Sequence, residues 1–171
     1  MTATLRAEPS PGEMDCVSDE RAVLRTWLRM LACTNIMENH VRGSLREKFD
    51  TTLPRFDLLA QLDAATAQAP LGLTMSELSR RLMVTNGNLT GLVDRLVREG
   101  LVARVVSPPD RRAQMISLTV TGKQALDSMT PDHAMWVRDM FGGLADAERR
   151  KLYALLGKLK RSAQAVAERG R

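Results

Sequence analysis

The segment from Thr74 to Thr119 constrains the fold more than any other part of this chain, because its patterns predict two short helices followed at once by a β-hairpin. A helix is expected to begin near Met75, since Thr74 and Glu77 have the spacing at which a hydroxyl and a carboxylate satisfy free backbone N–H groups at a helix start. The apolar stripe of this helix is Met75, Leu78 and Leu82. The break that follows, residues 84–87, is short enough to hold two helices at a steep angle.

The second helix has one apolar face and one face of small or polar residues. The apolar residues follow an uninterrupted i, i+3, i+4, i+7, i+8 pattern: Leu89, Leu92, Val93, Leu96 and Val97. Gly100 suits the left-handed position at which many helices end. The opposite face carries Asn86, Gly87, Asn88, Thr90, Gly91, Asp94 and Arg95. Small residues let a helix enter the major groove of DNA, and Asn and Arg can bond base edges in pairs, although an ordinary solvated face has the same composition.

A β-hairpin is expected directly after these helices. Residues 101–106 are rich in β-branched side chains, residues 108–110 end the strand, and residues 114–118 return with alternating apolar character. Two arginines at the tip, Arg111 and Arg112, are common on any soluble surface, but beside a DNA-reading helix they can reach phosphates or the narrow minor groove. Asp110 would then orient one guanidinium through a charge-assisted hydrogen bond. This order of elements is that of a winged helix-turn-helix.

Together these motifs resemble the MarR family of transcriptional regulators. The resemblance rests on residues 87–102 (GNLTGLVDRLVREGLV), on residues 110–113 (DRRA) and on residues 118–122 (LTVTG), which open the next helix. The order of elements agrees with the family from about Val17 to Val166. The resemblance implies a mainly α fold with a small β-hairpin wing, that is, a winged helix-turn-helix plus a helical dimerisation region.

The resemblance also implies where this chain would contact double-stranded DNA. Asp110 and Arg112 correspond to the wing pair, with Arg112 entering the minor groove. Together with the polar face of the first helix and the turn, the expected contacts are Ser76, Arg80, Thr85, Asn86, Gly87, Asn88, Thr90, Arg95, Asp110, Arg111 and Arg112. A homodimer on a pseudo-palindromic operator is implied as well, since such operators are read as half-sites about one helical turn, roughly 10 bp, apart.

The distribution of charge agrees with a nucleic-acid partner better than the total does. An isoelectric point near 9.8 indicates an acidic partner of unspecified kind. Residues 75–115 hold seven Lys or Arg against four Asp or Glu, and residues 146–171 hold eight against three. The first twenty residues have the opposite charge balance, with one Arg against five Asp or Glu. Positive charge is therefore concentrated where a phosphate-tracking surface would need it.

The remaining segments predict a disordered tail and three helical regions. Residues 1–17 contain two prolines and a glycine and are expected to be disordered. Residues 18–171 then form a single domain, with the winged helix-turn-helix at about 54–119 and dimerisation helices at about 18–49 and 120–168. The last helix has a leucine-rich stripe that requires a partner surface. Pro131 is expected to kink or break its helix at Thr130, because proline removes a backbone donor and clashes with the preceding turn.

Other classes of protein find little support. No apolar run has membrane-spanning length, and the N-terminal residues lack the apolar core of a secretory signal. Cys16 and Cys33 do not have a metal-ligand spacing, so no metal or other cofactor is expected. A nucleophile elbow, a Gly-rich phosphate loop and suitably spaced paired acids are all missing, which argues against an enzyme. A reduced cytoplasmic protein is the expectation.

The effector class is suggested by a second resemblance. Residues 51–62 and 84–88, with His133 and Trp136, resemble MarR regulators of hydroxycinnamate and other lignin-derived aromatic catabolism, several of which respond to an aromatic acid or to its coenzyme A thioester. Residues 133–136 read His-Ala-Met-Trp where those regulators often have His-Glu-x-Trp, so this chain lacks that carboxylate.

An aromatic acid needs a flat apolar slot, a cation and hydrogen-bonding groups. Candidates for these roles are Arg25, Trp27, Arg29, Met30, Asn35, His40, Arg46, Arg55, Phe56, His133, Met135 and Trp136. The alternatives are that Trp27 and Trp136 belong to the core, that His40 is an exposed helix residue and that Arg55 only faces solvent.

A thiol switch is the alternative function. It would use Cys33, which lies in the middle of the first helix. Such a switch needs a lowered thiol pKa and a resolving thiol. The apolar neighbours Leu31, Ala32 and Ile36 favour instead an inert core residue, and Cys16 lies on the expected tail.

Overall fold

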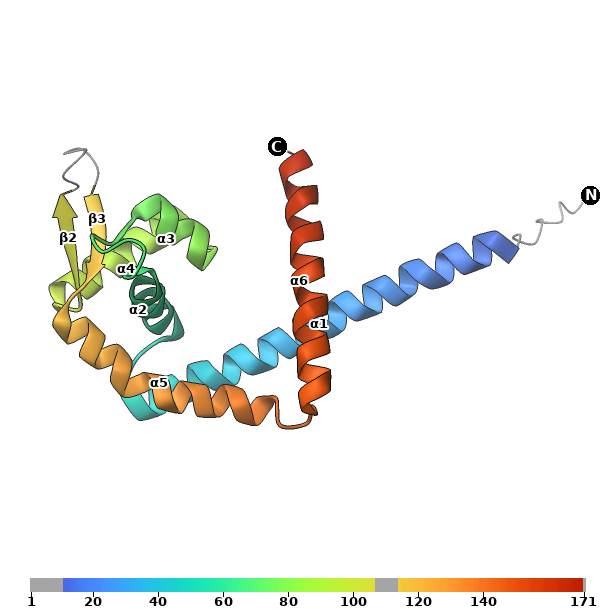
Figure 1. The fold of residues 1–171 in the computed structure, drawn as a ribbon, viewed down its shortest axis with the longest axis horizontal. Helices are drawn as coiled ribbons and strands as arrows, with labels where there is room; N and C mark the ends of the chain where they lie inside the picture. Colours follow the sequence, from blue (N-terminus) through green and yellow to red (C-terminus); the bar gives the residue numbers. More distant parts are fainter. Residues whose placement is uncertain (1–10, 107–113, 171) are drawn as a thin grey trace, which may run out of the picture. The chain divides into compact units, whose positions relative to one another are not determined.

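The computed structural model describes residues 11–106 and 114–170, except for the side chains of residues 11–19 and of Asn86. The elements follow in the order α1 (Pro11–Phe49), α2 (Leu53–Ala65), β1 (Leu73–Thr74), α3 (Met75–Leu82), α4 (Asn86–Arg98), β2 (Val102–Val106), β3 (Gln114–Leu118), α5 (Val120–Met140) and α6 (Asp146–Arg169) (Figure 1). The predicted fold class, mainly α with a small β wing, is confirmed. The chain divides into two units, one ending at His40 and one beginning at Val41, and each is described by itself.

Helix α1 begins at Pro11 and not at Ser18, where we expected the first helix to start. The prolines and the glycine of residues 1–17 had indicated a disordered tail instead. Proline is favourable in the first turn of a helix, because its φ angle is already helical and its missing N–H has no partner there in any case. The part of the expected tail that precedes Pro11 lies outside the described residues.

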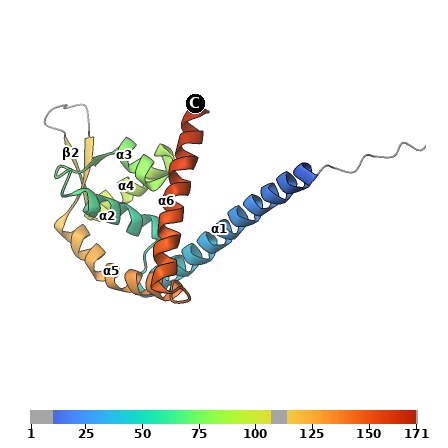
Figure 2. The same cartoon turned by 45° about the vertical axis from the view of Figure 1, so that its right-hand side comes forward.

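The core of the second unit lies where the last turns of α1, helices α2 to α5 and the sheet meet. It consists of buried apolar side chains from each of these elements: Val41, Leu45, Phe56, Leu58, Leu59, Leu62, Ala65, Leu73, Leu78, Leu89, Val93, Leu96, Val102, Ile116, Leu126 and Met129. Both apolar patterns predicted for α3 and α4 contribute to it, which explains why these two helices keep fixed orientations against α2 and the sheet (Figure 2).

The sheet has three antiparallel strands in the order β1-β3-β2. The expected hairpin is present, with Val102 opposite Leu118 and Val106 opposite Gln114. No sequence pattern predicted β1, a two-residue strand that pairs Leu73 with Ile116. Gly72 precedes it with a φ of 101°, and a Cβ there would stand 2.0 Å from the Ile116 carbonyl oxygen, so only glycine lets the chain approach β3 this closely.

The start of α3 and the end of α4 follow the predicted capping patterns. Thr74 and Glu77 form a complete capping box, and the hydrogen bonds from Thr74 lower the pKa of the Glu77 carboxyl. Gly100 has a φ of 72°, and its N–H donates to the Val97 carbonyl while that of Leu101 donates to the Leu96 carbonyl. This pair of bonds is a Schellman motif. It ends the helix and turns the chain into β2.

Helix α5 continues through Pro131, so a break at Thr130 is wrong. Figure 1 shows α5 changing direction along its length, and a proline inside a helix is a common cause of such a bend. Two hydroxyls support the helix next to the missing donor: Thr130 Oγ1 donates to the Leu126 carbonyl at 2.8 Å and Ser128 Oγ donates to the Ala125 carbonyl at 2.7 Å. Such side-chain bonds to the preceding turn are associated with bent helices.

Substitution of Gly122 tests the close contact between α5 and the end of α4. A Cβ at this position would stand 1.9 Å from the Leu101 carbonyl oxygen, so Gly122→Ala must displace backbone. We expect a loss of about 1–3 kcal/mol in the free energy of unfolding, measured by urea denaturation. Gly43→Ala is the control, because a Cβ there meets nothing within 4 Å and alanine favours a helix. Equal stability of Gly122→Ala and wild type would contradict the tight junction.

Candidate nucleic-acid interface and neighbouring cavity

Helix α4 buries its apolar face and exposes its polar face. Leu89, Val93 and Leu96 are fully buried, and Leu92 and Val97 pack partly buried against the same core. The opposite face is exposed at the residues expected to contact DNA: Gly87, Asn88, Thr90 and Arg95. Asn86 is the first helical residue, its side chain being outside the described set, and Thr85 is the exposed N-cap. The helix therefore presents a small, polar, N-terminal surface of the kind that a major groove accepts.

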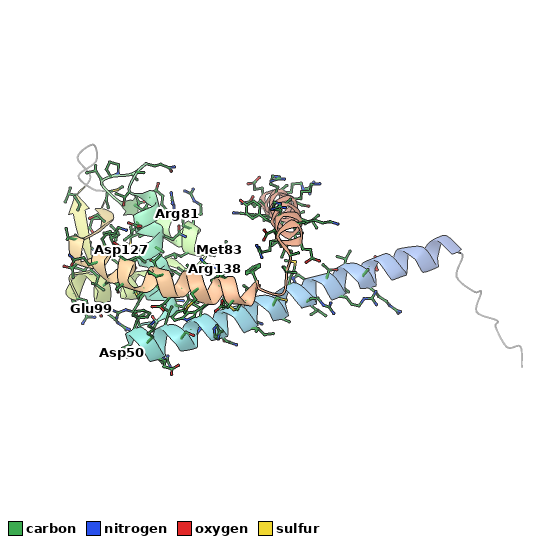
Figure 3. All side chains as sticks on the ribbon, turned by 60° about the horizontal axis from the view of Figure 1, so that its bottom comes forward. Asp50, Arg81, Met83, Glu99, Asp127 and Arg138 are labelled. Carbon is green, nitrogen blue, oxygen red and sulfur yellow. The ribbon has the colours of Figure 1, made fainter. Side chains whose placement is uncertain are left out.

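Helix α3 adds two exposed residues next to this face. Ser76 and Arg80, both expected to contact DNA, are exposed on α3. The turn between α3 and α4 is tight: Met83 has a φ of 54° and Ser79 Oγ donates to the Val84 carbonyl at 2.6 Å. Met83 is 86% exposed, so the turn presents an apolar side chain to solvent (Figure 3). The wing tip with Asp110, Arg111 and Arg112 lies outside the described residues.

An ion pair fastens α4 to the wing. Asp94, which the sequence pattern placed on the polar face, accepts a hydrogen bond from Arg104 of β2. Sequence reasoning did not assign Arg104 a role, because the two residues lie on different elements. The pair joins α4 to the hairpin, and an exposed pair of this type stabilises by only about 0–1 kcal/mol.

The far end of α4 is held by Arg55 of α2. Arg55 Nη1 donates to Glu99 Oε1 at 2.8 Å and Nη2 donates to Glu99 Oε2, a bidentate pair in which both side chains are partly buried. Glu99 is the C-cap of α4, where a negative charge opposes the helix dipole by about 0.3–1 kcal/mol unless a cation offsets it. Arg55 supplies that cation. Its Nε is buried with no hydrogen-bond acceptor among the described residues, which costs about 1–3 kcal/mol.

A cavity of about 160 Å³ adjoins this ion pair. Its apolar lining comes from α1, α2, α5 and the start of the wing: Phe49, Leu59, Leu101, Ala125 and Met129. Its polar lining is Asp50, Thr51, Arg55 and Ser128. All of these residues belong to the unit that begins at Val41. Asp50 and Glu99 are both labelled in Figure 3, the first lining the cavity and the second paired with Arg55.

The proposed ligand residues of the second unit fall into two aromatic contacts and two arginines. His133 stacks on the buried Phe56 with ring centroids 4.4 Å apart, and Trp136 meets Phe49 edge-on at 6.4 Å. Trp136 packs against the core, so the core alternative describes it better than a free slot. Arg46 is exposed, whereas Arg55 is not simply solvent-facing, because it pairs with Glu99.

Burial lowers the pKa of His133 from its ordinary value of 6.5. The folded protein therefore favours the neutral imidazole. Because the unfolded chain binds this proton more readily, the contribution of His133 to stability is present above pH 6.5 and is lost as the pH falls through the lowered value.

The other proposed ligand residues lie on α1 within the first unit. Arg25, Trp27, Arg29, Asn35 and His40 are exposed there, and Met30 is partly exposed. Trp27 is 53% exposed, so it is not a core residue of this unit, and His40 is the exposed helix residue that the alternative described. Cys33 is also exposed and free, so it is not the core residue of this unit that we expected. Its neighbours in sequence are apolar, but they are exposed as well, so they do not enclose it.

Glu99 and Phe49 are functional candidates that sequence reasoning missed. For Glu99 a signal existed, since an acid at the C-terminal end of a helix predicts a nearby cation. For Phe49 none existed. Across the described ranges, no group of three or more His, Cys, Asp or Glu side chains could hold a metal ion. Within the same residues, none of the helices combines the length and apolar character needed to cross a bilayer.

Comparison with known proteins agrees with this geometry. Residues 49–113 match the model of the MarR family. An HTH-type transcriptional regulator of Bacillus cereus is 31% identical over 139 residues, which cover 81% of this chain and 88% of that regulator. The HTH-type transcriptional regulator PecS of Dickeya dadantii is 31% identical over 131 residues, 77% of this chain and 78% of PecS. The crystal structure of an S. aureus MepR–DNA complex superposes with a TM-score of 0.67 at 25% identity, covering 81% of this chain and 96% of that one.

The capped helix pair, the β-hairpin and the exposed polar face of α4 define a winged helix-turn-helix protein of the DNA-binding class. The chain belongs to the MarR family of transcriptional regulators.

Two substitutions in α4 separate its reading face from its core face. Asn88→Ala removes an exposed side chain and should reduce discrimination between a selected operator and random DNA without changing the melting temperature. Leu96→Ala removes a fully buried side chain and should cost about 2–5 kcal/mol of stability. Fluorescence anisotropy and thermal denaturation measure the two effects. Unfolding by Asn88→Ala, or unchanged discrimination, would mean that the faces are assigned wrongly.

Proposed function

We propose that this MarR-family regulator is a homodimeric repressor of aromatic-compound catabolic genes. It occupies a pseudo-palindromic operator and is released when a small aromatic acid or its coenzyme A thioester binds. The observation that carries the proposal is the exposed polar face of α4, held in place by a buried apolar face and by ion pairs at Asp94 and Glu99. Because the polar face of α4 is held by these contacts, it can change position as one unit.

The DNA partner is supported by chemistry and by the relatives. The exposed side chains on α3 and α4 include Asn88, Arg80 and Arg95, which can bond base edges or phosphates. MepR has been crystallised with DNA and E. coli MarR with operator DNA. In the proposed complex α4 enters the major groove, while Asp110 and Arg112 direct the wing toward the minor groove.

The homodimer is supported by apolar surface on both long helices. On α6, exposed apolar side chains recur at helical spacing: Leu155, Leu156, Leu159 and Val166. On α1, Val23, Leu24, Trp27, Leu28, Leu31 and Ile36 are exposed in the same manner. Apolar surface of this extent favours association. In the proposed dimer these helices bury one another and hold two reading helices at the spacing of two half-sites.

The aromatic effector is supported by the side chains that lie beside the winged helix-turn-helix. Arg55 provides a cation at a cavity with both apolar and polar lining residues, and Phe56 and His133 provide a tilted aromatic pair. An effector can shift the regulator only through different affinities for its DNA-bound and DNA-free shapes. The thiol alternative has in its favour the exposure of Cys33.

The wing is tested by Arg112→Ala. If Arg112 enters the minor groove, its loss should weaken operator binding by on the order of 1–3 kcal/mol and flatten the dependence of affinity on salt. Arg112→Lys is the matched control, because it keeps the charge and loses the planar guanidinium. An unchanged binding isotherm across a salt series would remove the wing from the mechanism, and full activity of the lysine variant would reduce its role to charge alone.

The effector class is tested by calorimetric titration of the protein with hydroxycinnamates, vanillate-like acids and their coenzyme A thioesters. A free acid requires one dominant arginine, so Ala substitutions at Arg25, Arg29, Arg46 and Arg55 should single out one position. A thioester would place its phosphates on basic surface, so several substitutions should each weaken binding a little. If none of these compounds binds, and peroxide releases operator DNA from wild type but not from Cys33→Ser, the thiol switch replaces this proposal.

A further inference from the structure

The turn between α3 and α4 holds a methionine in a backbone conformation that methionine rarely adopts. Met83 has φ and ψ angles of 54° and 36°, in the left-handed region. Glycine, and occasionally asparagine or aspartate, enters that region routinely, whereas the Cβ makes it unfavourable for other residues. Among the described residues the other non-glycine with a positive φ is Asp50, which is of the tolerated kind. The backbone of this turn therefore suits asparagine or glycine better than methionine.

Burial does not explain the methionine either. Met83 is 86% exposed (Figure 3), and its neighbour Val84 is 39% exposed. A single exposed apolar side chain is common on protein surfaces. One that also occupies an unfavourable backbone position gains from neither conformation nor packing, and such outliers cluster at functional sites. The combination indicates that the side chain of Met83 serves contact with another molecule.

Hydrogen bonds to Ser79 hold the turn in place. The Ser79 carbonyl accepts from the Met83 N–H and, at 3.2 Å, from the Val84 N–H. Ser79 Oγ donates to the Val84 carbonyl at 2.6 Å. The next residue, Thr85, is the N-cap of α4. The turn therefore presents Met83 from a fixed backbone position directly before the reading helix.

The surroundings of Met83 favour DNA as the partner. The last turn of α3 carries Arg80 and Arg81, which are both exposed, and the polar N-terminal surface of α4 begins on the other side of the turn. Basic and polar side chains around an apolar one suit the phosphates and base edges of DNA better than an apolar protein surface. The turn is also continuous with the end of α4 that would enter the major groove, so Met83 would meet the same groove.

We propose that Met83 contacts the C5-methyl group of a thymine in the major groove and thereby specifies thymine at one fixed position of each half-site. The inference rests on the proposed function, because it requires α4 to enter the major groove. The thymine methyl is the apolar group that base edges present in this groove. Methionine suits the contact, because its unbranched thioether chain adapts to the shape that it meets.

Selection of operators from a random-sequence pool gives the first test. DNA selected by wild type should carry a thymine at one position of each half-site. DNA selected by Met83→Ala should keep the other preferred bases and lose the preference for thymine at that position. Identical preferences of the two proteins at every position would overturn the proposal.

Removal of single methyl groups tests the contact directly. Replacing each operator thymine in turn by deoxyuridine deletes one methyl group and leaves the hydrogen-bonding edge of the base unchanged. At the contacted position this change should weaken binding by wild type by about fourfold, the effect of one buried carbon, and leave binding by Met83→Ala unchanged. If both proteins lose affinity equally, another residue contacts the methyl group. If wild type loses none, Met83 meets only the sugar-phosphate backbone. Either result overturns the proposal.

A second variant at Met83 keeps folding out of the result. Met83→Asn suits the left-handed backbone, so its melting temperature should equal or exceed that of wild type while the sensitivity to deoxyuridine is lost. The matched control is Val120→Ala, which shortens an apolar side chain that is 77% exposed at the first residue of α5. It should respond to deoxyuridine as wild type does. A folded Met83→Asn variant with the sensitivity of wild type would contradict the contact.

The outcomes separate this inference from the proposed function. If Asn88→Ala reduces discrimination while both Met83 variants read DNA as wild type does, the inference fails and the reading role of α4 stands. If Met83 reads a thymine but no aromatic compound releases the operator, the inference stands and the proposed effector fails. If wild type selects no operator at all, both fail.

Discussion

The arrangement of α4, the hairpin and α5 depends on one hydrogen-bond acceptor, the Leu101 carbonyl oxygen. It accepts hydrogen bonds from the Thr119 N–H at 3.2 Å and from Thr119 Oγ1 at 3.0 Å, and Gly122 approaches it so closely that no side chain fits there. Thr119 also caps α5 by accepting from the Gly122 N–H at 2.9 Å. One short segment thus fixes the end of α4, the base of the hairpin and the start of α5. The directions of the reading helix and the wing cannot change independently.

The Arg55 ion pair acts on the same junction from the other side. Glu99 lies two residues before Leu101, and Leu101 itself lines the cavity beside Arg55. The Schellman motif at Gly100 leaves this stretch little freedom, because both of its carbonyl acceptors lie in the last turn of α4. Through Leu101 the cavity lining is therefore continuous with the hydrogen-bonded backbone at the end of α4.

Local sequence rules predicted the parts of the domain that local interactions decide. The capping box at Thr74, the apolar face of α4 and the left-handed Gly100 all follow from contacts within a few residues, and all are present. Of the two outcomes predicted at Thr130, a kink or a break, the break does not occur, because neighbouring hydroxyls support the helix and α5 stays helical through Pro131. The Arg55–Glu99 pair joins residues 44 positions apart, so no periodicity reveals it. The strand β1 is too short to leave a pattern at all.

In the proposed homodimer, small movements where α4, the hairpin and α5 meet strongly change the fraction of operator DNA that is bound. Each protomer reads one half-site, and the two readings reinforce one another only while their separation matches that of the DNA. The exposed apolar stripe on α6 makes that separation a property of the assembled pair, so it also makes operator binding depend on protein concentration. An effector therefore does not have to unfold α4 or cover its polar face. It needs only to shift the end of the helix enough that both half-sites cannot be engaged at once.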